Sequence, residues 1–130
     1  MADVNITVTQ LQLPSSGATA TTPIAQSVIT ASDQFVCIND GKTFWEVENT
    51  AGGTVGLRIF TPGSFLGIAV ADQTVTIPAG PASPVGSPSL LIGPFPTDSF
   101  NNTEGANAGK MTADIVSGTH ANCKIRAFRF

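Results

Sequence analysis

Charge is scarce in this sequence. Of its 130 residues, six are Lys or Arg and nine are Asp or Glu, a charged share of 12% with a net charge of −3. Globular proteins usually carry about 25%. Six scattered basic residues give no stripe that follows phosphates, which argues against a nucleic-acid partner. No apolar run approaches the roughly 18 residues of a membrane span.

The N-terminus, MADVNITVTQ, lacks the basic segment and apolar stretch of a signal peptide. We therefore expect a protein made in a cytoplasm that has no membrane partner. A chain of this length usually forms one domain and buries enough surface to fold without disulfides.

Histidine and cysteine are also rare, with one histidine and two cysteines. Cys37 and Cys123 lie in the apolar, strand-like runs FVCIN and NCKIRAF, and His120 lies in a Gly-Thr turn. Two buried free thiols are the simplest expectation for the cysteines. A disulfide between neighbouring strands is the alternative, and a cytoplasmic origin counts against it. A metal site is disfavoured because a single histidine is available to complete it.

Patterns that carry catalysis are incomplete. Glu46 and Glu48 stand two apart on a predicted strand, a separation of roughly 7 Å that resembles a glycosidase pair. The solvent-facing side of a strand is the better explanation, because no aromatic cleft and no second acidic strand accompany the pair. The segment Thr103–Thr112 misses the phosphate-binding loop pattern, because three residues instead of four precede its Gly-Lys and Met111 follows. A hairpin loop is the better account.

No other pattern supplies a site. His120 has no neighbouring nucleophile motif, so we interpret it as a solvated loop residue. Three aspartates lack the spacing of a calcium loop. We predict no enzyme, no cofactor, and no catalytic, cofactor-binding or metal-binding residue. The three aspartates are Asp72, Asp98 and Asp114. Three basic residues in predicted strands are interpreted as solvent-facing charges: Arg58, Lys124 and Arg126.

What the sequence has in abundance is strand-forming residues and turn residues. It is 42% hydrophobic with 13 Gly and 9 Pro, and no segment has helical periodicity. Seven to nine short strands are expected, which predicts an all-β fold, an antiparallel β-sandwich or a closed, jelly-roll-like barrel. The segments that match a strand pattern are 4–8, 34–39, 42–48, 55–59, 73–77, 90–95, 111–116 and 122–130. Segment 24–31 is a further candidate for a short strand, and the apolar segment 65–71 is interpreted as a strand or a buried loop.

Alternation within the strands predicts the core. Asp40-Gly41 between two apolar runs predicts a hairpin with a type I′ turn. After it, Trp45 and Val47 share one face, and we expect that face to be buried. The residues expected in the core are Trp45, Val47, Val55, Leu57, Ile59, Val75, Ile77 and Ile92.

The order of three segments is also informative: VENTAGGTVGLRI, QTVTIPAG and LLIGPF, followed by a final strand pair. Together they resemble a group of small tailed-bacteriophage virion proteins, the capsid decoration (cement) and head accessory proteins. The resemblance covers about residues 35–130. The matching residues are Asn49, Thr50, Gly52, Gly53, Val75, Ile77, Ala79, Gly80, Ile92, Gly93, Pro94 and Phe95.

The resemblance implies a virion structural protein on the capsid surface, made in the host cytoplasm, with the major capsid protein as partner. A homotrimer is expected, because capsid lattices offer three-fold sites. Two departures leave a tail location open: the proline-rich segment Pro78–Pro88 is longer than the pattern, and residues 1–34 have no counterpart. The alternative is a β-sandwich binding module of a tail or fibre that contacts a host surface or carbohydrate.

The N-terminal segment has a character of its own. No charged residue lies between Asp3 and Asp33, nor between Asp72 and Asp98. Solvated loops usually carry charge, whereas neutral segments suit contact with another protein. We therefore predict a division into an N-terminal arm or strand segment (1–34) and a β-sandwich domain (35–130). The arm is expected to contact a neighbouring subunit or the capsid.

Overall fold

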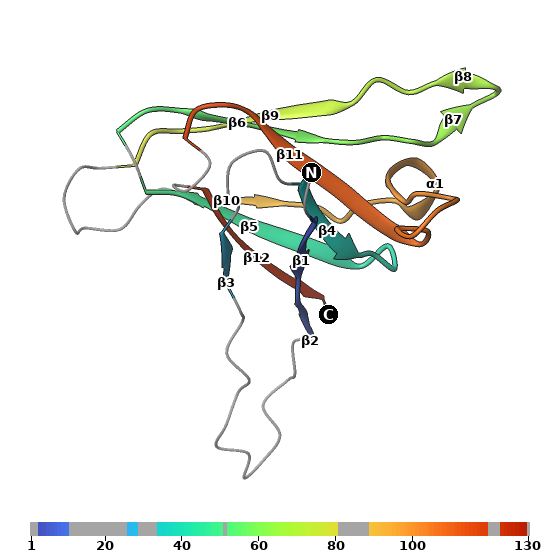
Figure 1. The fold of residues 1–130 in the computed structure, drawn as a ribbon, viewed down its shortest axis with the longest axis horizontal. Coiled ribbons are helices and arrows are strands. Elements are labelled where there is room, and N and C mark those ends of the chain that lie inside the picture. Colours follow the sequence, from blue (N-terminus) through green and yellow to red (C-terminus); the bar gives the residue numbers. More distant parts are fainter. Residues whose placement is uncertain are drawn as a thin grey trace, which may run out of the picture.

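The computed structural model describes residues 3–10, 26–28, 34–50, 52–80, 89–119 and 123–129. Nearly all of its elements are strands, and they form two packed layers (Figure 1). The expected all-β sandwich is confirmed. The layers stay separate sheets and do not close into a barrel.

Sheet 1 has the strand order β1-β4-β11-β6-β9, and sheet 2 has the order β10-β5-β12-β2, with β3 also paired to β12. The strands of sheet 1 are β1 Asp3–Ile6, β4 Gln34–Ile38, β11 Lys110–Ser117, β6 Val55–Ile59 and β9 Gln73–Ile77. Those of sheet 2 are β10 Ser89–Ile92, β5 Thr43–Asn49, β12 Cys123–Arg129, β2 Val8–Gln10 and β3 Gln26–Val28. The remaining elements are β7 Ser64–Phe65, β8 Ile68–Ala69 and the helix α1 Thr97–Phe100.

These elements exceed the seven to nine strands expected. The surplus comes from short pieces: the first strand is divided at Thr7, and a small β7–β8 hairpin lies apart from both sheets. The predicted strand 24–31 corresponds to the three-residue β3.

The N-terminal segment joins the two layers. β1 runs parallel to β4 in sheet 1, and after Thr7 the chain continues as β2, parallel to β12 in sheet 2. Both sheets are therefore mixed, not purely antiparallel as predicted. Ile6 before the break and Thr9 after it are both buried. The break at Thr7 thus changes which face of the segment is buried.

The described part of the predicted arm, residues 3–10 and 26–28, pairs with strands of the same chain. The division into segments 1–34 and 35–130 stays a prediction, and a deletion that tests it is given in the Discussion.

Several connections between consecutive strands cross from one sheet to the other. β4 belongs to sheet 1 and β5 to sheet 2, so the predicted Asp40-Gly41 hairpin is wrong: this connection crosses between the layers. Gly41 has φ +86°, and Asp40 does not share the positive φ that a type I′ turn needs. β5 and β6 also lie in opposite sheets. Alternating apolar residues mark a strand facing a core and do not tell which sheet holds it.

The core lies between the sheets. Six of the eight predicted core residues are fully buried, Trp45 among them. Val75 and Ile92 are only partly buried, because β9 and β10 are edge strands of their sheets. The six are Trp45, Val47, Val55, Leu57, Ile59 and Ile77, and further buried side chains that the prediction missed include Phe35, Phe95, Met111, Ile115 and Ile125.

A buried asparagine ties the layers together at one end. Asn49, at the end of β5, is fully buried and donates from its side-chain amide to the carbonyls of Gly53 (2.6 Å) and Pro78 (3.1 Å). Gly80 packs against the Asn49 carbonyl so closely that a side-chain carbon would collide with it. The two amide hydrogen bonds are a physical reason for Asn49, and the close approach is a physical reason for Gly80. Both residues belong to the pattern that carries the family resemblance.

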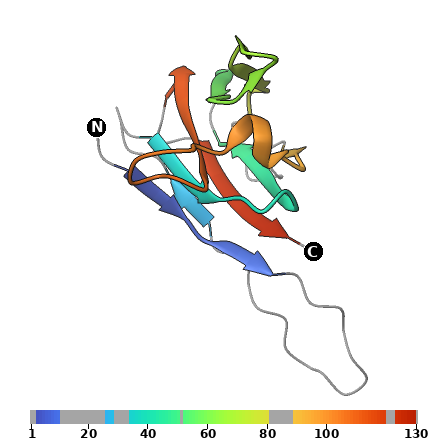
Figure 2. The same cartoon turned by 90° about the vertical axis from the view of Figure 1, so that its right-hand side faces the viewer.

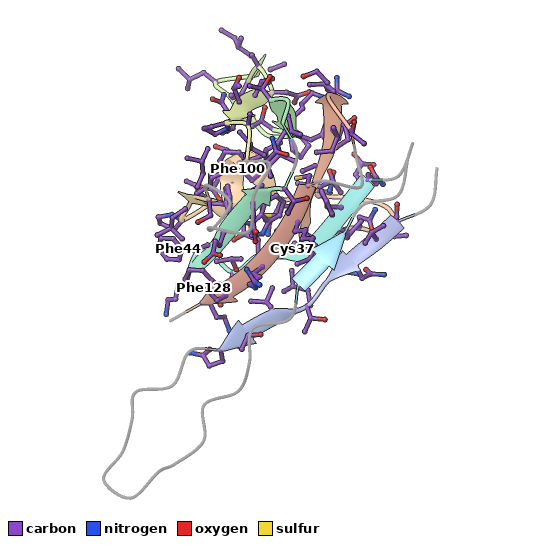
Figure 3. All side chains as sticks on the ribbon, turned by 90° about the vertical axis from the view of Figure 1, so that its left-hand side faces the viewer. Cys37, Phe44, Phe100 and Phe128 are labelled. Carbon is purple, nitrogen blue, oxygen red and sulfur yellow. The ribbon has the colours of Figure 1, made fainter. Side chains whose placement is uncertain are left out.

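The cysteines are buried free thiols, as expected, and the disulfide alternative is wrong. Cys37 lies in β4 of sheet 1 and Cys123 in β12 of sheet 2. Figure 3 shows Cys37 among the strands. Burial raises the pKa of Cys37 to about 11, an effect that a hydrogen bond from Trp45 partly opposes, and burial raises the pKa of Cys123 to about 12.

These shifts predict a loss of stability at alkaline pH. An exposed thiol of the unfolded chain ionises near its ordinary pKa of 9.0, whereas the folded thiols stay protonated until about pH 11. The contribution of the two thiols to the free energy of unfolding should therefore be constant below about pH 9 and fall between about pH 9 and pH 11. Urea unfolding across this range measures it. The double variant Cys37→Ala/Cys123→Ala is the control and should lose this component of the pH dependence; an unchanged slope would refute the assignment.

Candidate partner-binding hairpin

The β7–β8 hairpin, residues 61–72, is the feature that the sandwich core does not explain. It extends from the β6–β9 pair beyond the two layers (Figures 1 and 2). Phe65 and Ile68 are paired, so Leu66 and Gly67 form a two-residue turn. Leu66 is 87% exposed and Ile68 is 72% exposed. The hairpin thus presents two large aliphatic side chains to solvent at its tip.

The backbone of Leu66 makes this exposure more unusual. Leu66 has φ +52° and Gly67 has φ +78°, the pattern of a type I′ turn. Asn or Asp is favoured at the first of these positions, and a residue such as Leu costs about 1–2 kcal/mol there. Neither turn geometry nor solvation favours Leu66. Departures from local rules of this kind concentrate at functional sites.

The base of the hairpin is braced by polar contacts. Thr61 donates its backbone N–H to an Asp72 carboxylate oxygen at 2.9 Å and its hydroxyl to the Val70 carbonyl at 3.0 Å. The Gly63 N–H donates to the Ser99 carbonyl at 3.2 Å, which ties the hairpin to α1. A side-chain carbon at Gly63 would collide with the backbone of Asp98. The apolar tip therefore stands on a fixed support.

Apart from Asp72 at its base, the hairpin carries no charge. No charged residue lies between Arg58 and Asp72. Arg58 holds Asp114 through two hydrogen bonds of 2.9 and 2.6 Å and lies over the Phe60 ring, 4.7 Å from its centroid. This carboxylate raises the pKa of Arg58. The charges nearest the hairpin's base are thus engaged within the chain, and the tip can enter a partner without desolvating a charge.

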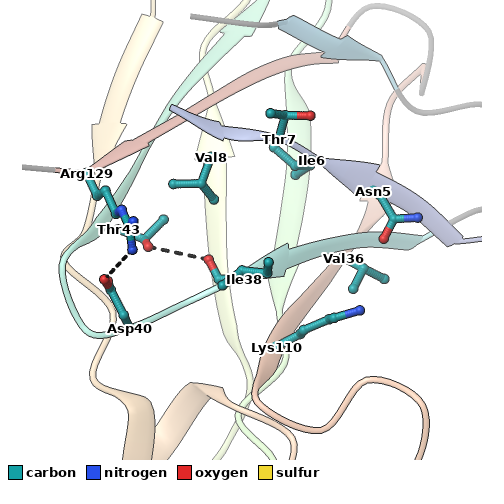
Figure 4. Close-up of a pocket in the computed structure, with 10 residues that line it drawn as sticks. All are labelled: Asn5, Ile6, Thr7, Val8, Val36, Ile38, Asp40, Thr43, Lys110 and Arg129. Carbon is teal, nitrogen blue, oxygen red and sulfur yellow. Dashed lines mark hydrogen bonds and ion pairs between the residues drawn. The ribbon is translucent and has the colours of Figure 1, made fainter. Parts of the chain in front are cut away.

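A pocket of about 370 Å³ lies where β1 passes into β2 (Figure 4). Its lining is Asn5, Ile6, Thr7, Val8, Val36, Ile38, Asp40, Thr43, Lys110 and Arg129. Arg129 donates to Asp40 at 2.8 Å, and the Thr43 hydroxyl donates to the Ile38 carbonyl at 3.4 Å. The N–H of Lys42 and then Arg129 lower the pKa of Asp40. These four residues thus bind one another in pairs within the chain.

The outer face of sheet 2 holds the predicted glutamate pair. Arg126 of β12 lies 3.2 Å from Glu46 and 3.6 Å from Glu48 of β5. Phe44 and Phe128 stack beside them with ring centroids 5.9 Å apart, and Figure 3 marks both rings. One cation between two carboxylates offsets part of the negative charge of this strand surface. The arrangement agrees with the solvent-facing reading of Glu46 and Glu48.

The other candidate residues are dispersed. Asp72 braces the hairpin, Asp98 lies in α1 and Asp114 pairs with Arg58. The near-miss phosphate loop precedes β11 and has positive φ at Gly105 and Gly109, as a tight turn requires. His120 falls outside the described residues. Within those residues no group of three His, Cys, Asp or Glu side chains is placed to hold a metal ion.

Sequence reasoning missed the hairpin tip. Residues 65–71 were predicted as a strand or buried loop because they are apolar. The available signal was the dipeptide Leu66-Gly67 between Phe65 and Ile68, with Pro62-Gly63 before it. Apolar composition alone predicts burial, and it does not reveal that a turn has too few neighbours to bury it.

Comparison with known proteins adds no family. No family model, no curated protein sequence and no solved structure matches the chain. The part of the chain that the structure describes contains no helix long and apolar enough to span a membrane.

Proposed function

We propose that the chain is a virion structural protein, a capsid decoration (cement) protein that binds the major capsid protein and stabilises the shell. The observation that carries the proposal is the braced hairpin that exposes Leu66 and Ile68. Large exposed aliphatic residues on a projecting element are typical of protein–protein contacts. The segments that resemble cement and head accessory proteins support the same reading.

Such a function needs contacts and no chemistry. A protein that binds the assembled shell and not its separated subunits stabilises the assembled state by mass action. A neutral apolar tip suits this task, because burying it releases water from apolar surface without stranding a charge. Assembly as a homotrimer on the capsid surface, after synthesis in the host cytoplasm, belongs to the same proposal.

Removal of the two aliphatic side chains at the tip tests the proposal. Leu66→Asn/Ile68→Thr is expected to bind decoration-depleted particles at least about tenfold more weakly than the wild-type chain, a loss of about 1.4 kcal/mol. Because Asn suits the positive φ at position 66, the variant should fold at least as stably as the wild type. Equilibrium binding to stripped particles and urea unfolding measure the two effects.

Leu91→Thr is the matched control. Leu91 is another exposed aliphatic residue, and it lies on β10, away from the hairpin. This variant should bind as the wild type does. Failure of the wild-type chain to rebind stripped particles would overturn the capsid proposal. Binding that is unaffected by the tip variant would overturn the role of the hairpin.

A further inference from the structure

We propose that β9 is an interface with a second copy of this chain, in which the two β9 strands pair antiparallel about Val75 and join two copies of sheet 1. β9 forms one edge of sheet 1, and among the described strands it pairs only with β6. An edge strand presents unpaired N–H and carbonyl groups, and these groups form hydrogen bonds with any extended chain that can approach.

The usual protection against such pairing is missing from β9. Natural edge strands carry charges, prolines or bulges that prevent unwanted association. The five residues QTVTI contain neither charge nor proline, and their register with β6 is continuous from Gln73 to Ile77. The opposite edge strand, β1, begins with a charged residue, Asp3. The unprotected edge is therefore suited to being covered.

The sequence of β9 matches itself across a two-fold axis. Thr74-Val75-Thr76 reads the same in both directions, so antiparallel pairing centred on Val75 places Thr74 opposite Thr76 twice. Threonine pairs across strands are favourable. The described strands at the edges of sheet 2 are also uncharged, but their sequences, SLLI (β10), VTQ (β2) and QSV (β3), offer no such symmetry. These features favour a second copy as the occupant.

The faces of the strand agree with this pairing. Gln73, Val75 and Ile77 lie opposite Ile59, Leu57 and Val55, which are core residues. Pairing centred on a residue keeps the inner faces of both copies on the same side of the joined sheet. Val75, now only partly buried, would then lie beside its counterpart and complete its burial. Thr74 and Thr76 are exposed on the outer face.

A pair of charge variants tests the contact and its register. In Thr74→Lys/Thr76→Lys, each introduced Lys faces a Lys of the other copy, and dimerisation should weaken about tenfold or more. In Thr74→Lys/Thr76→Glu, each introduced Lys faces a Glu, and dimerisation should equal or exceed that of the wild type. The variants differ only at position 76, so any effect of the Thr74→Lys change on folding is common to both. Circular dichroism verifies that both are folded.

The readout is sedimentation equilibrium over a concentration series in dilute buffer. In solution, away from the three-fold sites of a capsid, the wild-type chain should reach twice the 13.3 kDa mass of one chain. A wild-type chain that stays monomeric overturns the proposal, as does equal weakening of both charge variants. A trimer that neither variant disturbs also overturns it. The contact does not depend on what the hairpin binds, so loss of particle binding by Leu66→Asn/Ile68→Thr with an intact dimer contradicts neither proposal.

Discussion

Replacing Trp45 with Ala is expected to lower the free energy of unfolding by about 3–5 kcal/mol. The Trp45 side chain is fully buried between the sheets. Its ring meets Phe95 edge-to-face at a centroid distance of 5.3 Å, and its indole N–H donates to the Cys37 sulfur at 3.4 Å. Removal of the ring leaves a cavity bordered by both sheets. It also removes the aromatic partner of Phe95.

Urea unfolding followed by far-UV circular dichroism measures this loss, because the variant lacks the chain's single tryptophan as a fluorescent probe. Leu91→Ala is the control. Leu91 is 66% exposed, and its removal should change stability by about 0.5 kcal/mol or less. A loss below about 1 kcal/mol for Trp45→Ala would place the ring outside the core and contradict the packing of the two layers.

Deletion of residues 1–10 is expected to cost at least about 3 kcal/mol and to approach complete unfolding. This segment supplies β1 to β4 and β2 to β12, so its loss opens one edge of each sheet. It also removes Ile6, which is buried in the core. Thermal and urea unfolding of the shortened chain measure the cost.

Two point variants separate side-chain and backbone contributions. Ile6→Ala should lose about 2–5 kcal/mol, whereas Asn5→Ala, at an exposed position of the same strand, should stay near the wild type. If the shortened chain were as stable as the wild type, the pairing of β1 with β4 and of β2 with β12 within one chain would be contradicted. That result would favour the N-terminal arm that the uncharged sequence predicts. Such an arm must leave its own sandwich to reach a neighbouring subunit.

Strand positions were largely predictable from the sequence. The predicted strand 73–77 and β9 have the same bounds, and 34–39, 42–48 and 55–59 match β4, β5 and β6 closely. In β5, apolar residues alternate with polar ones, and in β6 they alternate with glycine and arginine; the apolar face of both strands is buried. Trp45 and Val47 were placed correctly for this reason. The strand β4 instead has a continuous apolar run, FVCI.

Strand partners were not predictable in the same way. The pattern on either side of Asp40-Gly41 fits a hairpin, yet β4 and β5 face each other across the core. Both arrangements bury alternate residues, so periodicity does not distinguish them. The choice depends on contacts between residues distant in sequence. Asn39, for example, donates to the Phe95 carbonyl at 2.9 Å and to the Asn101 side chain at 2.8 Å, and so fixes the corner between the layers.

The candidate site was least accessible to sequence reasoning. Apolar residues at 65–71 predict burial, and the structure instead leaves Leu66 and Ile68 exposed at the tip of a turn. Exposure depends on how far the hairpin extends past the sheets, which is a property of the whole fold. The edge position of Val75 was hidden for the same reason, since its alternation is that of a core residue.

A cryo-electron-microscopy reconstruction of a capsid with this chain bound is the most direct test of the proposed capsid decoration function. A capsid decoration protein should give density for the sandwich on the outer surface of the capsid. The hairpin tip at Leu66 and Ile68 should be buried against the major capsid protein. Density for the chain in the tail or a fibre, or on the capsid with this tip facing solvent, would contradict the proposal.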